Sequence, residues 1–314
     1  MSAERGPILT LPAYAKVNLS LEVVGRRPDG FHDLVSVTQL VSLADRIDVA
    51  PADVFSIGMD PPVVGAEENL AWRAAHALAD ATGRAPTGRL GVAKRIPLAA
   101  GLGGGSSDAA ASLRLFDRLW GARLGTRGLS PLAATLGSDV PLFLMGGLNL
   151  IRGRGEIVEA LPPAPKFGLL LIHPGGAPPD KTRALYAALG PLDFGDGATT
   201  LALAERLRAG RSIADAPLVN TFDAAAARVY PDFVALRTEL AGRLGRPVHL
   251  SGAGPTLFAL YGTPEEARTA AATVAGLGVE TFAVRSIARR PTIRTVRPAQ
   301  LQRFRYETEE ELVP

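Results

Sequence analysis

A glycine- and serine-rich stretch has the residue types that most clearly suit a chemical task. Four of the five residues Gly101-Leu102-Gly103-Gly104-Gly105 are glycine, and Ser106 and Ser107 follow directly. Glycine lets the backbone adopt positive φ and approach a ligand closely. Serine hydroxyls and the free N–H groups of a following helix suit a polyphosphate. The stretch lacks the Gly-Lys-Ser/Thr ending of a Walker A loop and the context of a Rossmann fingerprint. It predicts a phosphate-binding loop, with a flexible connector ahead of a serine-capped helix as the alternative.

Two charged residues could act on a phosphate bound at this loop. Asp139, in Gly137-Ser138-Asp139-Val140-Pro141, could accept the proton of an attacking hydroxyl. Alternatively, it could cap a helix that begins at the proline. Lys16 could neutralise the charge that spreads over a γ-phosphate during transfer, or it could be a solvated charge on an exposed strand face. The three features together indicate a kinase more strongly than any one of them alone.

The elements around Lys16 follow from local patterns. Polar and apolar residues alternate from residue 16 to residue 23, which predicts a half-buried strand with Lys16 and Asn18 on the same face. Arg27-Pro28-Asp29-Gly30 has the chemistry of a type I turn, and a second strand follows over residues 35–40. Phe31 and His32 should therefore sit just past a hairpin-like turn.

The remaining pattern predicts two domains of mixed helix and antiparallel sheet, an α+β fold class. Three prolines in residues 162–165 disfavour regular structure and mark a candidate domain boundary. Asn69 is a fitting N-cap, and residues 108–120 have an apolar stripe at helical spacing. Further strands are expected at residues 47–49, 91–96, 148–151, 167–173, 248–250, 256–261 and 279–284. Further helices are expected at residues 70–75, 181–189, 201–209, 224–244 and 265–277.

Composition excludes several functional classes. The 314 residues include no cysteine, which removes disulfide scaffolds, thiolate metal sites and cysteine nucleophiles. No apolar run reaches the roughly 18 residues that span a bilayer, and residues 1–9 lack a signal-peptide pattern. Residues 285–314 contain seven of the 34 basic and four of the 31 acidic residues, so the rest contains 27 of each. This balance argues against a broad nucleic-acid surface. We expect a cytoplasmic enzyme without membrane or nucleic-acid partners, as a monomer or weak homodimer.

Several motifs resemble those of one kinase superfamily. The run Pro97-Leu98-Ala99-Ala100-Gly101-Leu102-Gly103-Gly104-Gly105-Ser106-Ser107-Asp108-Ala109 resembles the phosphate loop of the GHMP kinases. That superfamily includes galactokinase, homoserine kinase, mevalonate kinase and phosphomevalonate kinase. Three further motifs are similar to the branch that acts on a cytidine diphosphate-linked methylerythritol: Ala15-Lys16-Val17-Asn18-Leu19, Arg27-Pro28-Asp29-Gly30-Phe31-His32 and Leu136-Gly137-Ser138-Asp139-Val140-Pro141. The resemblance runs from about residue 12 to residue 284.

The resemblance implies a fold and a reaction. The fold would be that of a two-domain GHMP kinase, with a ribosomal protein S5 domain 2-like catalytic domain at residues 1–163. A ferredoxin-like domain would follow at residues 164–288, and the sequence indicates no role for the extension at residues 289–314. The reaction would be transfer of phosphate from ATP, with Mg²⁺, to the C2 hydroxyl of 4-diphosphocytidyl-2-C-methyl-D-erythritol in the non-mevalonate isoprenoid pathway. The alternatives are a homoserine or mevalonate kinase, and a catalytically silent nucleotide- or RNA-binding module.

The resemblance also implies roles for residues at the phosphate end of the site. Lys16 and Asp139 would be the catalytic pair, and Asn18 would face the erythritol. Asn69 and Lys94 match positions near the adenosine. No carboxylate cluster suggests a dedicated metal cage, so Ser107 is the expected Mg²⁺ ligand. The expected ATP-binding residues of the loop are Pro97, Leu98, Ala99, Ala100, Gly101, Leu102, Gly103, Gly104, Gly105, Ser106 and Ser107.

At the other end, Phe31 and His32 match positions that hold cytosine, and Thr182 and Tyr186 would lie on its other side. An aromatic face can stack on a flat base, and a ring nitrogen can recognise its polar edge. Without the resemblance, Phe31 and His32 could equally be a packed turn residue and a surface histidine. The family usually has Tyr where Phe31 stands, and it has a Val-Ser run that residues 174–181 lack. Ser251-Gly252-Ala253-Gly254 resembles the family's C-terminal glycine loop.

Overall fold

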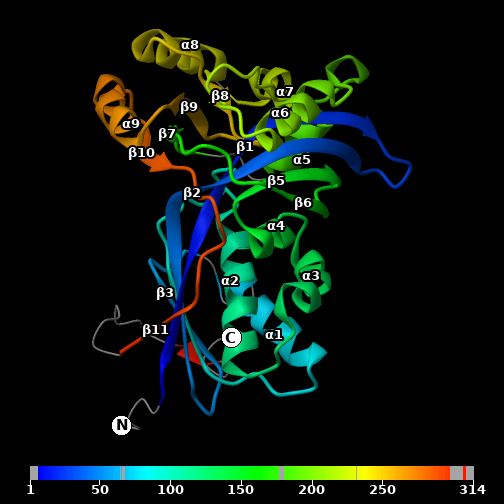
Figure 1. Ribbon diagram of the computed structural model, residues 1–314, viewed down its shortest axis with the longest axis vertical. Helices are drawn as coiled ribbons and strands as arrows, with labels where there is room; N and C mark the ends of the chain where they lie inside the picture. The colour runs from blue at the N-terminus through cyan, green and yellow to red at the C-terminus, as the bar shows by residue number, and fades with distance from the viewer. Residues whose placement is uncertain are drawn as a thin grey trace.

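Two very long strands are shared by both halves of the molecule. The computed structural model describes residues 6–63, 65, 68–176, 180–230, 232–297 and 307–308. Strands β1 (Ile8–Arg26) and β2 (His32–Ala50) form an antiparallel hairpin that runs from the lower half into the upper half in Figure 1. Residues along β1 belong to three different hydrophobic core clusters: Leu11 lies in the first, Val17 in the second and Val23 in the third. The hairpin therefore contributes to the cores of both halves.

The first half is a sheet covered by helices on one face. Its strands follow the order β11-β1-β2-β4-β3-β12, and β5 pairs with β2 and β6. Helices α1 (Leu70–Ala81), α2 (Gly104–Leu119), α3 (Gly125–Leu136) and α4 (Val140–Met145) belong to this half. Phe116 of α2 is fully buried in the same cluster as Ile47 and Leu90 of the sheet. The shorter strands are β3 (Ser56–Asp60), β4 (Arg89–Ala93), β5 (Leu148–Gly153) and β6 (Ile157–Leu161).

The second half has a ferredoxin-like topology. Its four strands are β7 (Gly168–His173), β8 (His249–Leu250), β9 (Leu257–Tyr261) and β10 (Glu280–Arg285). They pair antiparallel in the order β10-β7-β9-β8, so the first strand of the half lies between the fourth and the third. The helices are α5 (Lys181–Ala187), α6 (Ala198–Arg208), α7 (Phe222–Val229), α8 (Phe233–Leu244) and α9 (Pro264–Ala271), with short 3₁₀ turns at Pro191–Asp193 and Ala272–Val274. This arrangement confirms the expected fold class.

Three local expectations are wrong. The strands expected at residues 35–40 and 47–49 form one continuous strand, β2. The helix expected over residues 224–244 is two helices, because Tyr230 has the extended backbone (φ −99°, ψ 121°) that a following proline in the sequence favours. The polar face of β1 is buried, since Glu22 accepts a hydrogen bond from the backbone N–H of Thr200 in α6 at 2.7 Å. The half-buried strand is therefore covered on both faces.

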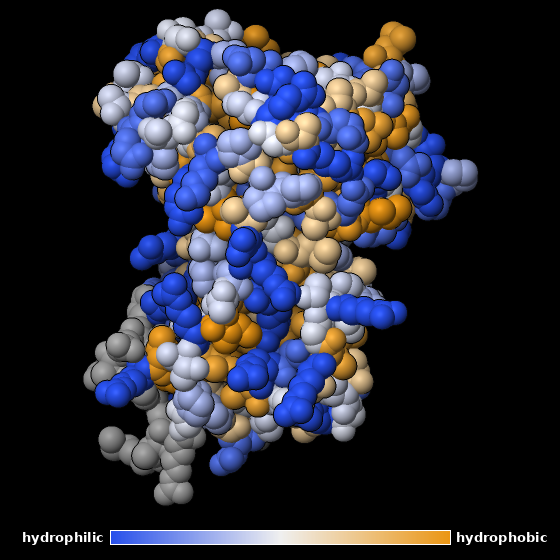
Figure 2. Space-filling model, viewed as in Figure 1, coloured by the Kyte–Doolittle hydropathy of each residue, from blue (hydrophilic) through white to orange (hydrophobic). Residues whose placement is uncertain are grey.

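The described part of the C-terminal extension returns to the first sheet. Strand β11 (Arg294–Val296) pairs antiparallel with β1, and β12 (Glu307–Thr308) pairs with β3. In Figure 1 the chain after β10 descends from the upper half to β11 in the lower half. Figure 2 shows the two halves as two lobes, the upper one wider. Within the described ranges, no helix has the length and apolar character to span a membrane.

Candidate active site

A cavity of about 1,060 Å³ brings distant parts of the chain together. Its lining comes from β1 and β2, from the glycine stretch before α2, from the residues before α4, from α5 and from the loop before β9. We call residues 97–107 the first glycine loop and residues 251–254 the second glycine loop. The three stretches singled out in the sequence therefore converge on one cavity.

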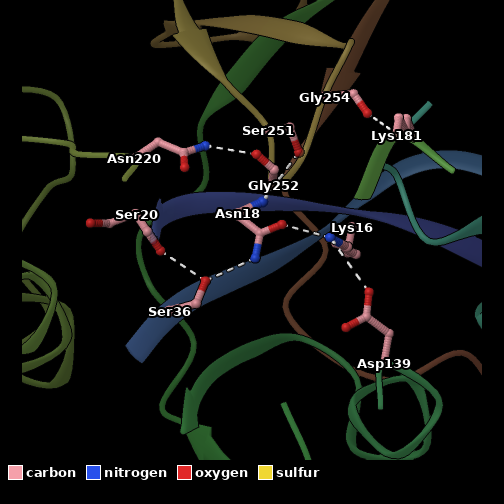
Figure 3. A network of polar contacts seen from close by, with 10 residues as sticks. All are labelled: Lys16, Asn18, Ser20, Ser36, Asp139, Lys181, Asn220, Ser251, Gly252 and Gly254. Carbon is pink, nitrogen blue, oxygen red and sulfur yellow. Dashed lines mark hydrogen bonds and ion pairs between the residues drawn. The ribbon is translucent and has the colours of Figure 1, made fainter. Parts of the chain in front are cut away.

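Lys16 and Asp139 face each other in this cavity (Figure 3). The Lys16 Nζ atom lies 3.6 Å from Asp139 Oδ2 and donates a hydrogen bond to Asn18 Oδ1 at 2.6 Å. Asn18 Nδ2 in turn donates to Ser36 Oγ at 2.8 Å, which orients the amide. Lys16 and Asn18 share one face of β1, as their spacing predicts. The Lys16 side chain is buried, in contrast to the exposed position considered from sequence alone.

Asp139 does not behave as a helix cap. It stands at the N-cap position of α4, but its backbone is helical (φ −82°, ψ −14°) and its side chain makes no capping hydrogen bond. An N-cap that satisfies a free helix N–H has an extended backbone and accepts with its side chain. The carboxylate lines the cavity instead. Its nearest cationic partner is Lys16.

The first glycine loop adopts the conformation that glycine permits. Gly103 precedes α2 with φ +71°, and an added Cβ would lie 2.7 Å from the Phe143 ring and 3.1 Å from Lys16 Cγ. The loop is anchored by two buried residues, because Leu102 O accepts from the Lys16 N–H at 2.9 Å and Ala100 O accepts from the Thr256 N–H at 3.3 Å. The free N–H groups of the first turn of α2 follow directly.

The second glycine loop closes on the Lys16–Asn18 pair. Gly252 has φ +57°, and an added Cβ would lie 2.8 Å from Asn18 Oδ1 and 3.3 Å from Lys16 Nζ. Asn220 Nδ2 donates to Gly252 O at 2.9 Å (Figure 3). It also donates to Leu250 O at 2.9 Å, and the two bonds fix the loop. The ferredoxin-like half thus supplies one wall of the cavity.

Only part of the first glycine loop lines the cavity: Ala99, Gly101, Gly103 and Ser106. Pro97, Leu98, Ala100, Leu102, Gly104 and Gly105 are not among the lining residues. Ser107, the residue expected to bind the metal, is buried, and its backbone N–H donates to Gly103 O at 2.9 Å. Its neighbour Ser106 is the serine of this loop that reaches the cavity.

The two residues expected near adenosine have other partners. Asn69 Oδ1 caps α1 by accepting from the Ala71 N–H at 2.8 Å. The Lys94 ammonium is buried between Asp45 and Asp108, 2.5 Å and 2.8 Å from their carboxylates. Burial raises the pKa of Asp108 well above its usual value, while the Lys94 charge lowers it. Lys94 therefore belongs to a buried ion network beside the glycine loop.

The residues expected at the cytosine end all line the cavity. Their aromatic rings do not face one another across an open slot for a base, because two of them stack directly on each other. Phe31 is 55% exposed, with the Arg154 guanidinium 4.8 Å from its ring centroid. His32 stacks on Tyr186 with centroids 4.8 Å apart, and burial lowers the pKa of His32. Burial and the charge of Asp139 raise the pKa of Tyr186 to about 12. Thr182 is exposed at the rim.

Sequence reasoning missed Lys181, the first residue of α5. Its ammonium is buried in the same cavity and donates to the carbonyl oxygen of Gly254. Burial, together with the charge of Lys16, lowers the pKa of Lys181 to about 8. A usable signal was its residue type, because the chain has only four lysines among its 34 basic residues. Three of these four, Lys16, Lys94 and Lys181, have buried side chains.

The few oxygen donors in the cavity suit a Mg²⁺ ion that binds together with the phosphates of the nucleotide. Within the described ranges, no group of three or more His, Cys, Asp or Glu residues could hold a metal ion. Mg²⁺ in phosphate-transferring sites is held by one or two protein oxygens together with phosphate oxygens and water. The cavity offers the Asp139 carboxylate and the Ser106 hydroxyl, which fit that requirement.

Comparisons with known proteins give a consistent result. The family model described as "GHMP kinases N terminal domain" matches residues 69–147. The 4-diphosphocytidyl-2-C-methyl-D-erythritol kinase of Dehalococcoides mccartyi is 42% identical over 254 residues, which cover 81% of this chain and 89% of that protein. A crystal structure of 4-(cytidine 5'-diphospho)-2C-methyl-D-erythritol kinase has 37% identity and a TM-score of 0.76, covering 88% of this chain and 98% of the other. A homoserine kinase from Cytophaga hutchinsonii shares the fold, with a TM-score of 0.70 at 18% identity, covering 94% of this chain and 99% of that one.

Proposed function

Because the chain belongs to the 4-diphosphocytidyl-2-C-methyl-D-erythritol kinase family of the GHMP kinases, we propose that it phosphorylates the C2 hydroxyl of that cytidine diphosphate substrate with ATP. The products are the 2-phosphate and ADP. The observation that carries this proposal is the Lys16–Asp139 pair, 3.6 Å apart in a cavity bounded by both glycine loops. The relative that is 42% identical is named 4-diphosphocytidyl-2-C-methyl-D-erythritol kinase, whereas the homoserine kinase with the same fold is only 18% identical.

Backbone N–H groups and the Lys16 ammonium would bind the phosphates of ATP. The N–H groups at the start of α2 and the turns of the first glycine loop would hold the β- and γ-phosphates of ATP. Lys16, held by Asn18, would neutralise the charge on the transferring group, which spreads over its equatorial oxygens. Positioning and charge stabilisation supply most of the catalysis in phosphoryl transfer.

The acceptor end rests on Asp139. Its carboxylate would accept the proton of the C2 hydroxyl as the oxygen attacks the γ-phosphorus, and the bond from that phosphorus to the β,γ-bridging oxygen would break. The proton then resides on Asp139 Oδ and the leaving electron pair on ADP. Asn18 would contact the erythritol, since its amide lies beside the Lys16 ammonium. Phe31, His32, Thr182 and Tyr186 would hold the cytidine at the open end of the cavity.

When bound, Mg²⁺ would supply charge neutralisation at the β- and γ-phosphates. Ser106 is the chain's proposed oxygen donor to it, because this serine lines the cavity and follows the first turns of the glycine loop. The expectation for Ser107 stays a prediction. Its hydroxyl would need a rearrangement at the start of α2 to reach the cavity, since the residue is buried.

An acceptor comparison tests this function. ADP release by the full-length chain is measured with ATP, Mg²⁺ and one of three acceptors: 4-diphosphocytidyl-2-C-methyl-D-erythritol, homoserine or mevalonate. We expect turnover with the first alone, and ³¹P NMR of the product should show a new phosphomonoester. Comparable kcat/KM with homoserine or mevalonate would assign the chain to another GHMP activity. Nucleotide binding without turnover on any acceptor would identify a catalytically silent module.

A further inference from the structure

A second cavity lies outside the active site, on the lobe that contains α2. It has a volume of about 720 Å³ and is formed by α2, the start of β1 and residues 289–295 of the C-terminal extension. In Figure 1 the chain after β10 passes beside α2 on its way to β11. Four arginines line it, Arg114 and Arg118 from α2 and Arg289 and Arg290 from the extension, with Leu9 and Ile293 among the apolar walls. We call this cavity the arginine groove.

The positive charges of the groove are not balanced by nearby carboxylates. No acidic residue of the described ranges lines the groove, and no ion pair within those ranges involves any of the four arginines. Arg114 and Arg118 lie one helical turn apart, a spacing at which like charges repel. Arg114 is partly buried, and a partly buried charge is normally paired in proteins, whereas Arg118, Arg289 and Arg290 are exposed. An anion bound in the groove would give Arg114 an opposite charge and would reduce the repulsion among the four guanidinium groups.

Two of the arginines are held in place by neutral acceptors. Arg114 Nη2 donates to the carbonyl oxygen of Pro291 at 2.8 Å, and Arg290 Nη1 donates to Thr126 Oγ1 at 2.5 Å. Burial, with a contribution from the charge of Arg290, lowers the pKa of Arg114 to about 10. These contacts fix the side chains without neutralising them. Arg114 and Arg290 are thus held in place before any ligand binds, which lowers the entropic cost of binding.

We propose that the arginine groove binds a small anion through a phosphate or diphosphate group. Guanidinium groups present planar pairs of N–H donors that match phosphate oxygens, and several of them converge here. A nucleic-acid surface would need basic residues over a wide area, whereas the chain before residue 285 has equal numbers of basic and acidic residues. The short, concave shape of the groove instead suits a single phosphorylated small molecule.

The groove is separate from the catalytic cavity but shares an element with it. None of its lining residues lines the catalytic cavity. Helix α2 begins at the first glycine loop, and Arg114 and Arg118 lie further along the same helix. Truncation of the extension would remove two of the four arginines and strand β11 together. The site therefore depends on the segment for which the sequence indicated no role.

Calorimetric titration with inorganic pyrophosphate tests the proposal. The full-length protein is first saturated with a non-hydrolysable ATP analogue and with cytidine diphosphate, so that both the nucleotide end and the cytidine end of the catalytic cavity are filled. The test variant is the double substitution Arg118→Met/Arg289→Met, because neither side chain makes a hydrogen bond within the described residues and both are exposed. The control is Arg268→Met, which removes an exposed charge on α9. We expect one saturable site in the parent and the control, and a dissociation constant at least about tenfold weaker in the double variant.

Two outcomes would overturn the proposal. One is the absence of saturable pyrophosphate binding in the parent, and the other is equal affinity in the parent and the double variant. A separate sedimentation assay with phosphatidylglycerol–phosphatidylcholine vesicles distinguishes a lipid headgroup from a free phosphate. If the parent protein does not bind pyrophosphate but sediments with the vesicles, and the double variant does not, then the groove binds an anionic membrane instead of a free phosphate. Unchanged kcat and KM for ATP in the double variant would separate this site from the catalytic one.

Discussion

The ammonium of Lys16 and the carboxylate of Asp139 lie 3.6 Å apart, but their side chains differ sharply in exposure, at 7% and 41%. The lysine is fixed by its hydrogen bond to Asn18, while the aspartate faces the open cavity without a capping contact. A fixed cation beside an accessible carboxylate suits a site in which one group holds phosphate and the other meets the acceptor. The carboxylate must be reachable for proton transfer, and the ammonium must not move.

Removal of the Asp139 charge should slow the chemical step. We expect Asp139→Asn to lower kcat by about 10²- to 10⁴-fold, the usual contribution of a positioned general base. The KM for the cytidine substrate should change little, because the amide keeps the size of the side chain. Asp215→Asn is the matched control, since Asp215 is exposed and lies outside the cavity. Steady-state kinetics with full activity in the Asn variant would exclude Asp139 as the base.

Phe31 should contribute to binding of the cytidine. Its exposed ring lines the cavity, and loss of one aromatic stacking partner of a base costs about 1–3 kcal/mol. We expect Phe31→Ala to raise the KM for the cytidine substrate about tenfold and to leave the KM for ATP unchanged. Val234→Ala, at an exposed apolar position on α8, is the control. Equal effects on both KM values would indicate a general change in the hairpin rather than loss of stacking.

Lys181 should give the enzyme a pH dependence near pH 8. Its ammonium is charged below its pKa of about 8, where it can attract the phosphates of either substrate, and it becomes neutral above it. We expect KM for ATP or for the cytidine substrate to rise as pH increases from 7 to 9. The other charged residues that line this cavity are Lys16, Arg26, Asp139, Arg154 and Arg183.

The variant Lys181→Arg separates Lys181 from these neighbours. Arginine stays charged across this range, so the variant should show a flat KM between pH 7 and 9. A profile identical to that of the parent would assign the titration to another group.

The lowered pKa of Lys181 also affects folding stability, with the opposite sign to its effect on substrate binding. The lysine of the unfolded chain, with an ordinary pKa near 10.4, binds more protons than the folded one between about pH 8 and 10. Deprotonation of Lys181 should therefore raise folding stability over that window.

Two parts of the site, the Lys16–Asn18 face and the first glycine loop, were predictable from local patterns. The period of two along β1 places Lys16 beside Asn18, and the glycine-rich composition of residues 101–105 matches the positive φ of Gly101 and Gly103. These are short-range properties, which the sequence encodes directly. The resemblance to a known superfamily then supplied the spatial relation to Asp139, which no local pattern could supply.

Other features depend on tertiary contacts and were not predictable in this way. The polar face of β1 looked solvent-exposed, but α6 covers it and Thr200 satisfies Glu22. The return of the extension to the first sheet depends on the pairing of Ile8 with Val296, almost the whole chain apart. The burial of Lys181 was not predictable because it is produced by a contact with Gly254, 73 residues away; only the rarity of lysine in this chain pointed to the residue.

Lys94 should contribute more to folding than its predicted place near adenosine suggests. Its ammonium neutralises the buried carboxylates of Asp45 and Asp108. Loss of one partner of a buried ion pair typically costs about 3–5 kcal/mol, so Lys94→Met should lower the free energy of unfolding by that amount. Lys166→Met, at an exposed lysine, should change it by less than about 0.5 kcal/mol.

Denaturant unfolding of both lysine variants tests this role. The loss in free energy of unfolding caused by Lys94→Met should become smaller as the pH is lowered. The buried carboxyl of Asp108 already has a raised pKa, and its protonation removes the unpaired charge. A folded Lys94→Met variant of parental stability with a raised KM for ATP would instead support a direct contact with the nucleotide.

Gly252 should contribute to catalysis because the structure leaves no room for a side chain at this position. An alanine Cβ there would lie 2.8 Å from Asn18 Oδ1 and 3.3 Å from Lys16 Nζ, and would displace the two side chains that we propose to act on the phosphate and the acceptor. Gly245→Ala is the matched control, since Gly245 has a similar φ of +62° with no atom within 4 Å of its added Cβ. Both variants should lose about 1–2 kcal/mol of stability from left-handed strain, whereas kcat/KM should fall at least about tenfold in Gly252→Ala alone. Equal activity in the two variants would show that the second glycine loop does not position Lys16.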